Sequence, residues 1–256
     1  MTIDELYIQL DLQPENKINI LKDVAIKCGN KGYLFVDSSD DGHCYLFDRN
    51  GNEVNIKKLT TIDNELFYDS NIESIVIPDS VESIGNWAFG YCGNLKSVEI
   101  PDSVKRIGNY AFYRCKSLKS IVIPDSIKNI EHGAFEYCIS LTSIVIPNSI
   151  ESIGEWAFGY CGNLKSVEIP DSVKWIESRA FADCTSLTSI NIPNSVKSIG
   201  KYAFNRCKSL TSINIPDSVE SIGEWAFADC TSLTNINIPD LLYGKSLEQL
   251  KPGAKG

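Results

Sequence analysis

A 23-residue repeat dominates the sequence from Ile72 onward and limits the folds that the chain can adopt. Its pattern is L-x-S-I-x-I-P-x-S-V-x-x-I-x-x-x-A-F-x-x-C-x-x, with seven complete copies and an eighth that opens at Leu233 and breaks after Pro239. A single unit of this length cannot bury its apolar residues alone, so such repeats fold only by stacking on their neighbours. The sequence therefore predicts a solenoid whose interior consists of columns of like residues.

The opening of each repeat, as in the stretch from Leu118 to Ile123, matches the leucine-rich pattern L-x-x-L-x-L that forms one short strand. Alternation places Ile121 and Ile123 on one face of this strand and Ser120 and Val122 on the other. The proline that follows ends the strand, because it has no N–H to donate. The rest of the repeat spaces its apolar residues three to five apart, which indicates short helical turns. We therefore expect a leucine-rich repeat of the α/β type, with a curved parallel β-sheet on the concave face and short helical turns on the convex face.

The repeat resembles the BspA-like class of leucine-rich repeats, whose unit shares the Pro, Ala-Phe and Cys positions. The resemblance covers residues 72–239. It implies a protein of host-associated bacteria, or of some protists, that acts at the cell surface or after secretion in adhesion and the binding of host components. The N-terminus carries acidic residues where a signal peptide has a basic flank, and no anchor is visible. The sequence alone therefore predicts a cytoplasmic protein if Met1 is the native start.

The chain divides into three predicted regions. Residues 1–71 form an N-terminal α+β cap with a helix over Pro14–Lys27, a β-hairpin over 32–36 and 43–47, and a degenerate first repeat in which Phe67 takes the Phe column. Residues 72–239 form the solenoid, and residues 240–256 form a C-terminal cap and tail. A cap is expected because a solenoid must shield its first open core.

The cysteines and histidines offer little catalytic chemistry. Seven cysteines form one column, and we interpret them as buried free thiols, because a line of parallel side chains cannot converge on a zinc ion: Cys92, Cys115, Cys138, Cys161, Cys184, Cys207 and Cys230. Cys28 and Cys44 lie in the cap, where they either pair or remain core thiols. No nucleophile–base pair and no cofactor motif is present, so the sequence predicts a protein that is not an enzyme and uses no cofactor.

One stretch of the cap has the spacing of a calcium loop. Asp37, Ser39, Asp41 and Asp48 fall at ligand positions of an EF-hand-like pattern, with Gly42 at the turn. The flanks are strand-like rather than helical, and position 12 is Asp instead of Glu. A polar hairpin loop is the favoured interpretation, and calcium binding is the alternative.

The exposed face of the strands is the surface expected to bind a partner. It combines a column of Ser with a column that changes from Val and Glu to Asn: Ser97, Glu99, Ser120, Val122, Ser143, Val145, Ser166, Glu168, Ser189, Asn191, Ser212 and Asn214. A second candidate is an aromatic column on the convex side, which we interpret first as packing between outer turns: Trp87, Tyr110, Trp156, Tyr202 and Trp225, interrupted by Gly133 and Arg179.

These features predict a monomeric module that binds a protein partner. The net charge of −9 argues against nucleic acid, and no apolar run is long enough for membrane insertion. The leading hypothesis is adhesion or another interaction with a host or partner protein. The alternative is an intracellular scaffold or effector that uses the same repeats.

Overall fold

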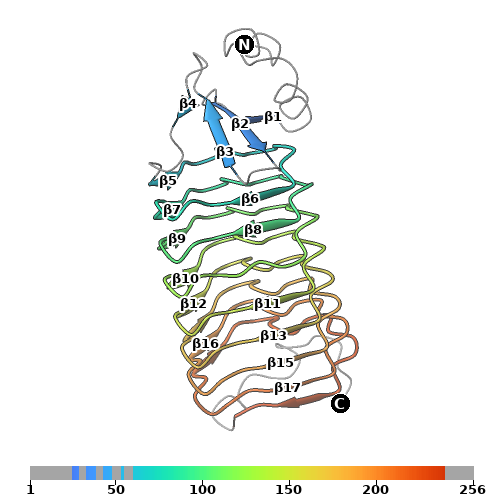
Figure 1. Cartoon of the computed structure of the whole chain (residues 1–256). Coiled ribbons are helices and arrows are strands. Elements are labelled where there is room, and N and C mark those ends of the chain that lie inside the picture. The colour runs from blue at the N-terminus through green and yellow to red at the C-terminus, as the bar shows by residue number, and fades with distance from the viewer. Residues whose placement is uncertain (1–24, 29–32, 39–42, 48–52, 55–59, 240–256) are drawn as a thin grey trace.

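The computed structural model describes residues 25–28, 33–38, 43–47, 53–54 and 60–239. From residue 60 to 239 the chain winds into a column of stacked coils, a parallel β-solenoid, with the earliest coil next to the N-terminal strands (Figure 1). Most coils carry two short strands separated by bends, and these strands pair in parallel with their counterparts in neighbouring coils in five sheets of two to five strands.

Two ladders of strands run the length of the column. The first ladder contains the strands that the leucine-rich pattern predicts: β6 (Ser74–Val76), β8 (Ser97–Glu99), β11 (Ser143–Val145), β13 (Ser166–Glu168), β15 (Ser189–Asn191), β17 (Ser212–Asn214) and β19 (Asn235–Asn237). In the coil of Ser120 only Val122 contributes to this ladder, through a bridge to Val145. The predicted alternation is confirmed, because the middle residue of each strand from β6 to β17 is buried and its two neighbours are exposed.

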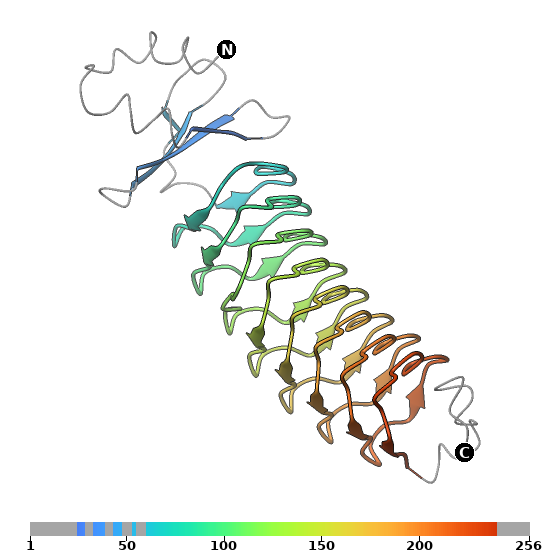
Figure 2. The same ribbon diagram turned by 90° about the vertical axis from the view of Figure 1, so that its right-hand side faces the viewer.

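The second ladder was not expected. It consists of two-residue strands: β5 (Thr61–Ile62), β7 (Ser83–Ile84), β9 (Arg106–Ile107), β10 (Asn129–Ile130), β12 (Ser152–Ile153), β14 (Trp175–Ile176), β16 (Ser198–Ile199) and β18 (Ser221–Ile222). The two ladders lie on different sides of each coil, and the tight turns align along one further side of the column (Figure 2). Figures 1 and 2 show coils that stack in a gently twisted column rather than along a pronounced arc.

The predicted helical turns on the convex side are wrong: none of the described residues is helical, and tight turns occupy this part of each coil. The segment from Gly154 to Cys161 shows why. Every second amide donates to a carbonyl of the next coil, Trp156 to Ser178 at 3.1 Å, Phe158 to Ala180 at 2.8 Å and Tyr160 to Ala182 at 2.7 Å. The amides between them donate three residues back along the chain. A helix would direct all of these amides along its own axis, so it would lose the bonds between coils.

Left-handed residues make these turns possible. Trp156 and Tyr160 have φ of 57° and 59°, and the corresponding two positions of every turn from Glu65 to Asp229 also have positive φ. A residue with a Cβ pays about 1–2 kcal/mol for this conformation. The bonds between coils and the packing of the coils must outweigh that cost.

The core consists of the predicted columns. The Phe rings are buried and stack on one another with centroids 5.0–5.5 Å apart. Phe67 stacks on Phe89 at 5.0 Å, which confirms its place as the first ring of the column. Ser70 takes the Cys position of this first coil and lies 3.3 Å from the Cys92 sulfur.

The seven column cysteines are buried free thiols, as expected. Each thiol donates a hydrogen bond to the backbone carbonyl of the Phe in the preceding coil, at 2.9–3.2 Å. For Cys92, the first thiol of the column, this residue is Phe67. Burial raises the pKa of Cys92 to about 11 and that of Cys161 to about 12. The column therefore adds hydrogen bonds between coils and presents no reactive thiolate.

The N-terminal strands form a separate antiparallel sheet in the order β1 (Ala25–Cys28), β2 (Tyr33–Ser38), β3 (His43–Phe47) and β4 (Glu53–Val54). The pairing of β2 with β3 agrees with the predicted hairpin. The predicted helix is wrong at its end, because residues 25–28 pair with β2 as a strand, where alternating residues gain a full ladder of hydrogen bonds. Residues 14–24 and the predicted C-terminal cap, residues 240–256, lie outside the described part of the chain.

The register of this sheet places the two cap cysteines on strands at opposite edges of β2. Cys28 lies opposite Tyr33 of β2, whereas Cys44 lies opposite Asp37 on the other edge of β2. Two strand spacings, about 10 Å, therefore separate the two Cα atoms, before their offset along β2 is added.

We expect the column thiols to resist alkylation while the chain is folded, since burial both excludes the reagent and holds the thiols protonated. Native protein treated with iodoacetamide at pH 8 should show no modification of Cys115, Cys138, Cys161 or Cys184 by peptide mass spectrometry. The same protein in guanidinium chloride should be modified at all four. Rapid labelling of Cys161 in the native state would contradict the described core.

Candidate functional site

The strand face, defined by the exposed residues of the first ladder, is flat and repetitive. Its Ser column is exposed from Ser97 to Ser212, as the strand pattern predicts. Val122 and Val145 are 72% and 74% exposed and belong to adjacent coils. Further along, the Asn237 side-chain amide donates a hydrogen bond to the Asn214 side-chain oxygen at 2.6 Å, so these two residues of the Asn column bond to each other. The two valines are therefore the most prominent apolar feature of this face.

The turn face, defined by the outward side chains of the tight turns, has a richer chemistry. Its first column contains the residues at the first left-handed position: Trp87, Tyr110, Gly133, Trp156, Arg179, Tyr202 and Trp225. A second column occupies the second left-handed position: Tyr91, Arg114, Tyr137, Tyr160, Asp183, Arg206 and Asp229. Ala, Phe and Cys of the same turns point inward and are buried. Each of these coils, except that of Gly133, thus presents two outward side chains four residues apart.

Rings of the turn face pack on one another, as the packing interpretation of the aromatic column predicts. Trp87 stacks on Tyr110 with centroids 4.4 Å apart, and Tyr137 stacks on Tyr160 at 4.2 Å. Two arginines join the rings. The Arg114 guanidinium lies 4.7 Å from the centroid of Tyr137, and that of Arg179 lies 5.2 Å from Trp156. These distances are within the range of cation–π attraction.

Gly133 breaks the aromatic column and changes the arrangement around it. Its φ of +59° is the left-handed value that glycine adopts without strain. A Cβ at this position would lie 2.4 Å from the Tyr110 ring, which has moved over the backbone of the glycine. The Tyr110 hydroxyl lies 2.6 Å from His132 Nε2, which fixes the ring there. The Tyr110 ring thus takes up the space directly above Gly133, and both Tyr110 and Trp156 line the open space beside it.

The turn of Gly133 has its large and small side chains in exchanged positions. The turns of Trp87 and Trp156 have a large residue first and a glycine three residues later, whereas this turn has Gly133 first and Glu136 three residues later. Gly90 and Gly159 occupy this position in the coils of Trp87 and Trp156, where the indole ring lies over the glycine. In the coil of Gly133 the outer residue is missing, and the carboxylate of Glu136 reaches to within 3.3 Å of where a Cβ of Gly133 would be. The carboxylate has therefore taken up part of the space above the glycine.

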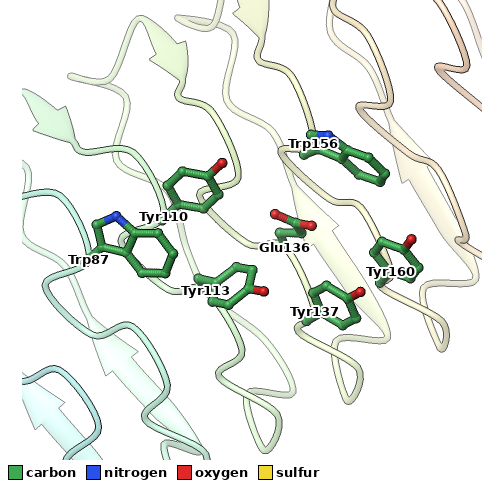
Figure 3. Close-up of a pocket in the computed structure, with 7 residues that line it drawn as sticks. All are labelled: Trp87, Tyr110, Tyr113, Glu136, Tyr137, Trp156 and Tyr160. Atoms are coloured by element: carbon green, nitrogen blue, oxygen red, sulfur yellow. The ribbon is translucent and has the colours of Figure 1, made fainter.

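The result is an open cleft of about 370 Å³ on the turn face. It is lined by Trp87, Tyr110, Tyr113, Glu136, Tyr137, Trp156 and Tyr160. Figure 3 shows the Glu136 carboxylate in the middle, with Tyr110 and Tyr113 on one side and Trp156, Tyr137 and Tyr160 on the other. The volume is at the lower end of the range of about 300–1,000 Å³ that small-molecule sites occupy.

Glu136 is an unusual carboxylate. It is only 8% exposed, and no hydrogen bond or ion pair joins its side chain to another described residue. Burial raises its pKa to about 7, with Glu155 adding to the rise and Arg114 opposing it. Burial also raises the pKa values of Tyr110, Tyr113 and Tyr137, so these rings remain neutral phenols at physiological pH.

The predicted calcium site is largely outside the described residues, which exclude Ser39, Asp41 and Asp48. Asp37 lies within β2, opposite Cys44. Among the described residues, no group of three or more His, Cys, Asp or Glu side chains is placed to hold a metal ion. No helix in this part of the chain is long and apolar enough to cross a membrane.

The sequence-based candidates did not include Glu136, Tyr113 or the second column of the turn face. A signal for Glu136 was present, because it is the one charged residue at its position in the repeats. The other repeats have Gly, Tyr, Ala or Asn there, as at Gly90, Tyr113, Ala182 and Asn205. The spatial neighbourhood of Glu136 was hidden, because it depends on which side chains the left-handed turns direct outward.

The family whose repeat has this form is the BspA type leucine-rich repeat region, which matches residues 60–187 and 152–247 in six copies. The chain belongs to the BspA-type leucine-rich repeat family. A comparison with curated proteins gave no match.

Solved structures of other leucine-rich repeat proteins are similar to this chain. A leucine-rich repeat protein from Bacteroides ovatus is 28% identical, with a TM-score of 0.64, over 82% of this chain and 52% of its own. The Treponema pallidum leucine-rich repeat protein is 34% identical, with a TM-score of 0.62, over 77% of this chain and 89% of its own. A leucine-rich cell surface protein from Faecalibacterium prausnitzii is 28% identical, with a TM-score of 0.52, over 84% and 76%. The chain thus spans about half the length of the B. ovatus protein.

We expect Glu136→Gln to stabilise this BspA-type solenoid in a pH-dependent manner. The folded-state pKa of about 7 lies above the value of about 4.3 in an unfolded chain. Below pH 4 both states are protonated, and the substitution should have little effect. As the pH rises to 7 the unfolded chain ionises first, so wild type loses up to about 3 kcal/mol relative to the Gln variant.

Urea unfolding followed by circular dichroism at pH 4 and pH 8 measures this difference. Glu99→Gln, on the exposed strand face, is the matched control and should leave the midpoint unchanged at both pH values. If Glu136→Gln were less stable than wild type at pH 8, the carboxylate could not be both buried and unpaired in the folded chain.

Proposed function

We propose that this BspA-type chain is a non-catalytic module that binds a protein partner, in adhesion or a related contact, through its strand face. The family fold supports the first part of this proposal, because leucine-rich repeat solenoids are typically protein-interaction modules. The observation that carries the choice of surface is the pair Val122 and Val145, more than 70% exposed on adjacent coils.

These valines are not required by the fold. The same column has Glu at 99 and 168 and Asn at 191, in strands of the same parallel ladder. Polar residues are therefore compatible with the strand at this position, and valine here leaves apolar surface in water. Covering each side chain with a partner would recover about 1.5–3 kcal/mol if the burial were complete.

The partner surface of this proposal comprises the Ser column and the variable column beside it, from Ser97 and Glu99 to Ser212 and Asn214. The carboxylates at 99 and 168 flank the valine pair along the column. Such a surface suits a partner that offers apolar groups at the centre and donors or basic groups at the rim. The cell-surface description of the F. prausnitzii protein supports a role outside the cell, where adhesion takes place.

A lysine at each valine tests the proposal. We expect the double variant Val122→Lys and Val145→Lys to lose the partner proteins that the immobilised wild-type chain retains from host extracellular-matrix and serum proteins, measured by quantitative mass spectrometry. The matched control is Asn148→Lys with Asn194→Lys, which adds the same charge at two exposed turn residues outside the proposed partner surface and should keep them.

Circular dichroism shows whether both double variants remain folded. Retention of the same proteins by the valine variant would move the binding site off this part of the strand face. Equal loss in both double variants would indicate a general effect of charge and would also contradict the proposed site.

A further inference from the structure

The cleft beside Gly133 contains a feature that the fold does not need. Glu136 is 8% exposed as a residue, and its carboxylate makes no hydrogen bond or ion pair to any described residue. Burial raises the pKa of this carboxyl group, so the group opposes folding once it ionises. Ala182 and Ala228 occupy the same position in other coils, so a small apolar residue is compatible with the turn. Destabilising groups that a fold can replace are characteristic of binding sites.

The rings around this carboxylate already bind cations that belong to the chain. The Arg114 guanidinium lies over Tyr91, Tyr113 and Tyr137, at 5.4, 5.4 and 4.7 Å from their centroids. On the other side of the cleft, Arg179 lies over Trp156 and Tyr202, at 5.2 and 5.0 Å. The turn face therefore presents several aromatic ring faces close enough together, and suitably oriented, for cation–π binding. Between these two arginines, the cleft itself is empty of any cation from a described residue.

The lining of the cleft selects among cations. Six aromatic rings and one carboxylate surround it, so it offers many ring faces and only one charged acceptor. A guanidinium presents five N–H donors and needs several acceptors to replace its water. A methylated ammonium group has few or no N–H donors and spreads its charge over methyl groups, which pack well on ring faces.

We propose that this cleft binds a methylated alkylammonium cation, whose methyl groups contact the rings of Tyr113, Trp156 and Tyr160 and whose charge faces the Glu136 carboxylate. The bound cation neutralises the buried carboxylate, so binding removes the penalty of its ionisation. This site is on a different surface from the strand face and does not depend on the partner proposed there. Two sources share the ligand chemistry, a free choline-like molecule and the side chain of a methylated lysine.

Choline chloride is the first probe, titrated into the full chain at pH 8 with indole nitrogens labelled for NMR. The chain has four tryptophans, and each gives one indole signal. We expect saturable shifts of the indole signals of Trp87 and Trp156, which line the cleft, and none at Trp175 and Trp225. The neutral isostere 3,3-dimethylbutan-1-ol should bind at least about ten-fold more weakly, a factor that corresponds to about 1.4 kcal/mol.

Two substitutions separate the cleft from the rest of the turn face. Glu136→Gln keeps the shape and removes the charge, and it should weaken choline binding about ten-fold while the chain stays folded. Trp156→Leu should also weaken binding, whereas Trp225→Leu, the same change at the same position of another coil, should not. Binding that survives both cleft substitutions, or that Trp225→Leu reduces equally, would overturn the proposal.

A short peptide with one trimethyllysine, and the same peptide with unmodified lysine, distinguish the two sources. Tighter binding of the trimethyllysine peptide than of choline assigns the site to a modified protein, and the reverse assigns it to a free quaternary ammonium compound. The unmodified peptide should bind more weakly than its trimethylated form. Failure of both choline and the trimethyllysine peptide to shift the Trp156 signal would overturn the proposal.

Discussion

The hydrogen bonds between the tight turns of neighbouring coils determine most of this structure. In each turn every second amide donates to the next coil, as Phe158 does to Ala180 at 2.8 Å, while the intervening amides close turns within the chain. This division allows the chain to bend sharply and still pair with both neighbours. It also keeps successive Phe rings parallel, with centroids 5.0–5.5 Å apart, so the core columns and the backbone bonds stabilise the same stacking.

The same turns determine the chemistry of the surface. Their two left-handed residues point outward in every coil, and the chain places aromatic and arginine side chains at many of these strained positions. Contacts between rings of adjacent coils contribute to holding them there, with about 0.5–1.5 kcal/mol for a well-placed aromatic pair. Where glycine replaces the aromatic residue, at Gly133, the column opens, and Glu136 occupies the gap. Two changes in one repeat, Gly133 and Glu136, thus convert a packed surface into a cleft with a partly buried carboxylate.

The sequence predicts the parts of the fold that depend on period and polarity. The strand with Ile121 and Ile123 inward, the Phe and Cys columns and the place of Phe67 all follow from spacing, and the structure confirms them. The turns were mistaken for helical turns, because apolar spacings of three and four suit both a helix face and the inside of a tight coil. Only the partners of the backbone amides distinguish the two, and these lie in another repeat. The neighbourhood of Glu136 was missed for the same reason, since Tyr110 and Trp156 line the cleft from the coils on either side of the coil of Glu136.

Scalar couplings across hydrogen bonds test the arrangement of the turns most directly. In deuterated protein, a long-range HNCO experiment detects the coupling between an amide nitrogen and the carbonyl carbon that accepts its proton. The structure predicts that the amide of Phe158 couples to the carbonyl of Ala180, 22 residues later in the next coil. A coupling from Phe158 to the carbonyl of Gly154, four residues earlier, would show a helical turn and would contradict both the stacking and the surface that depends on it.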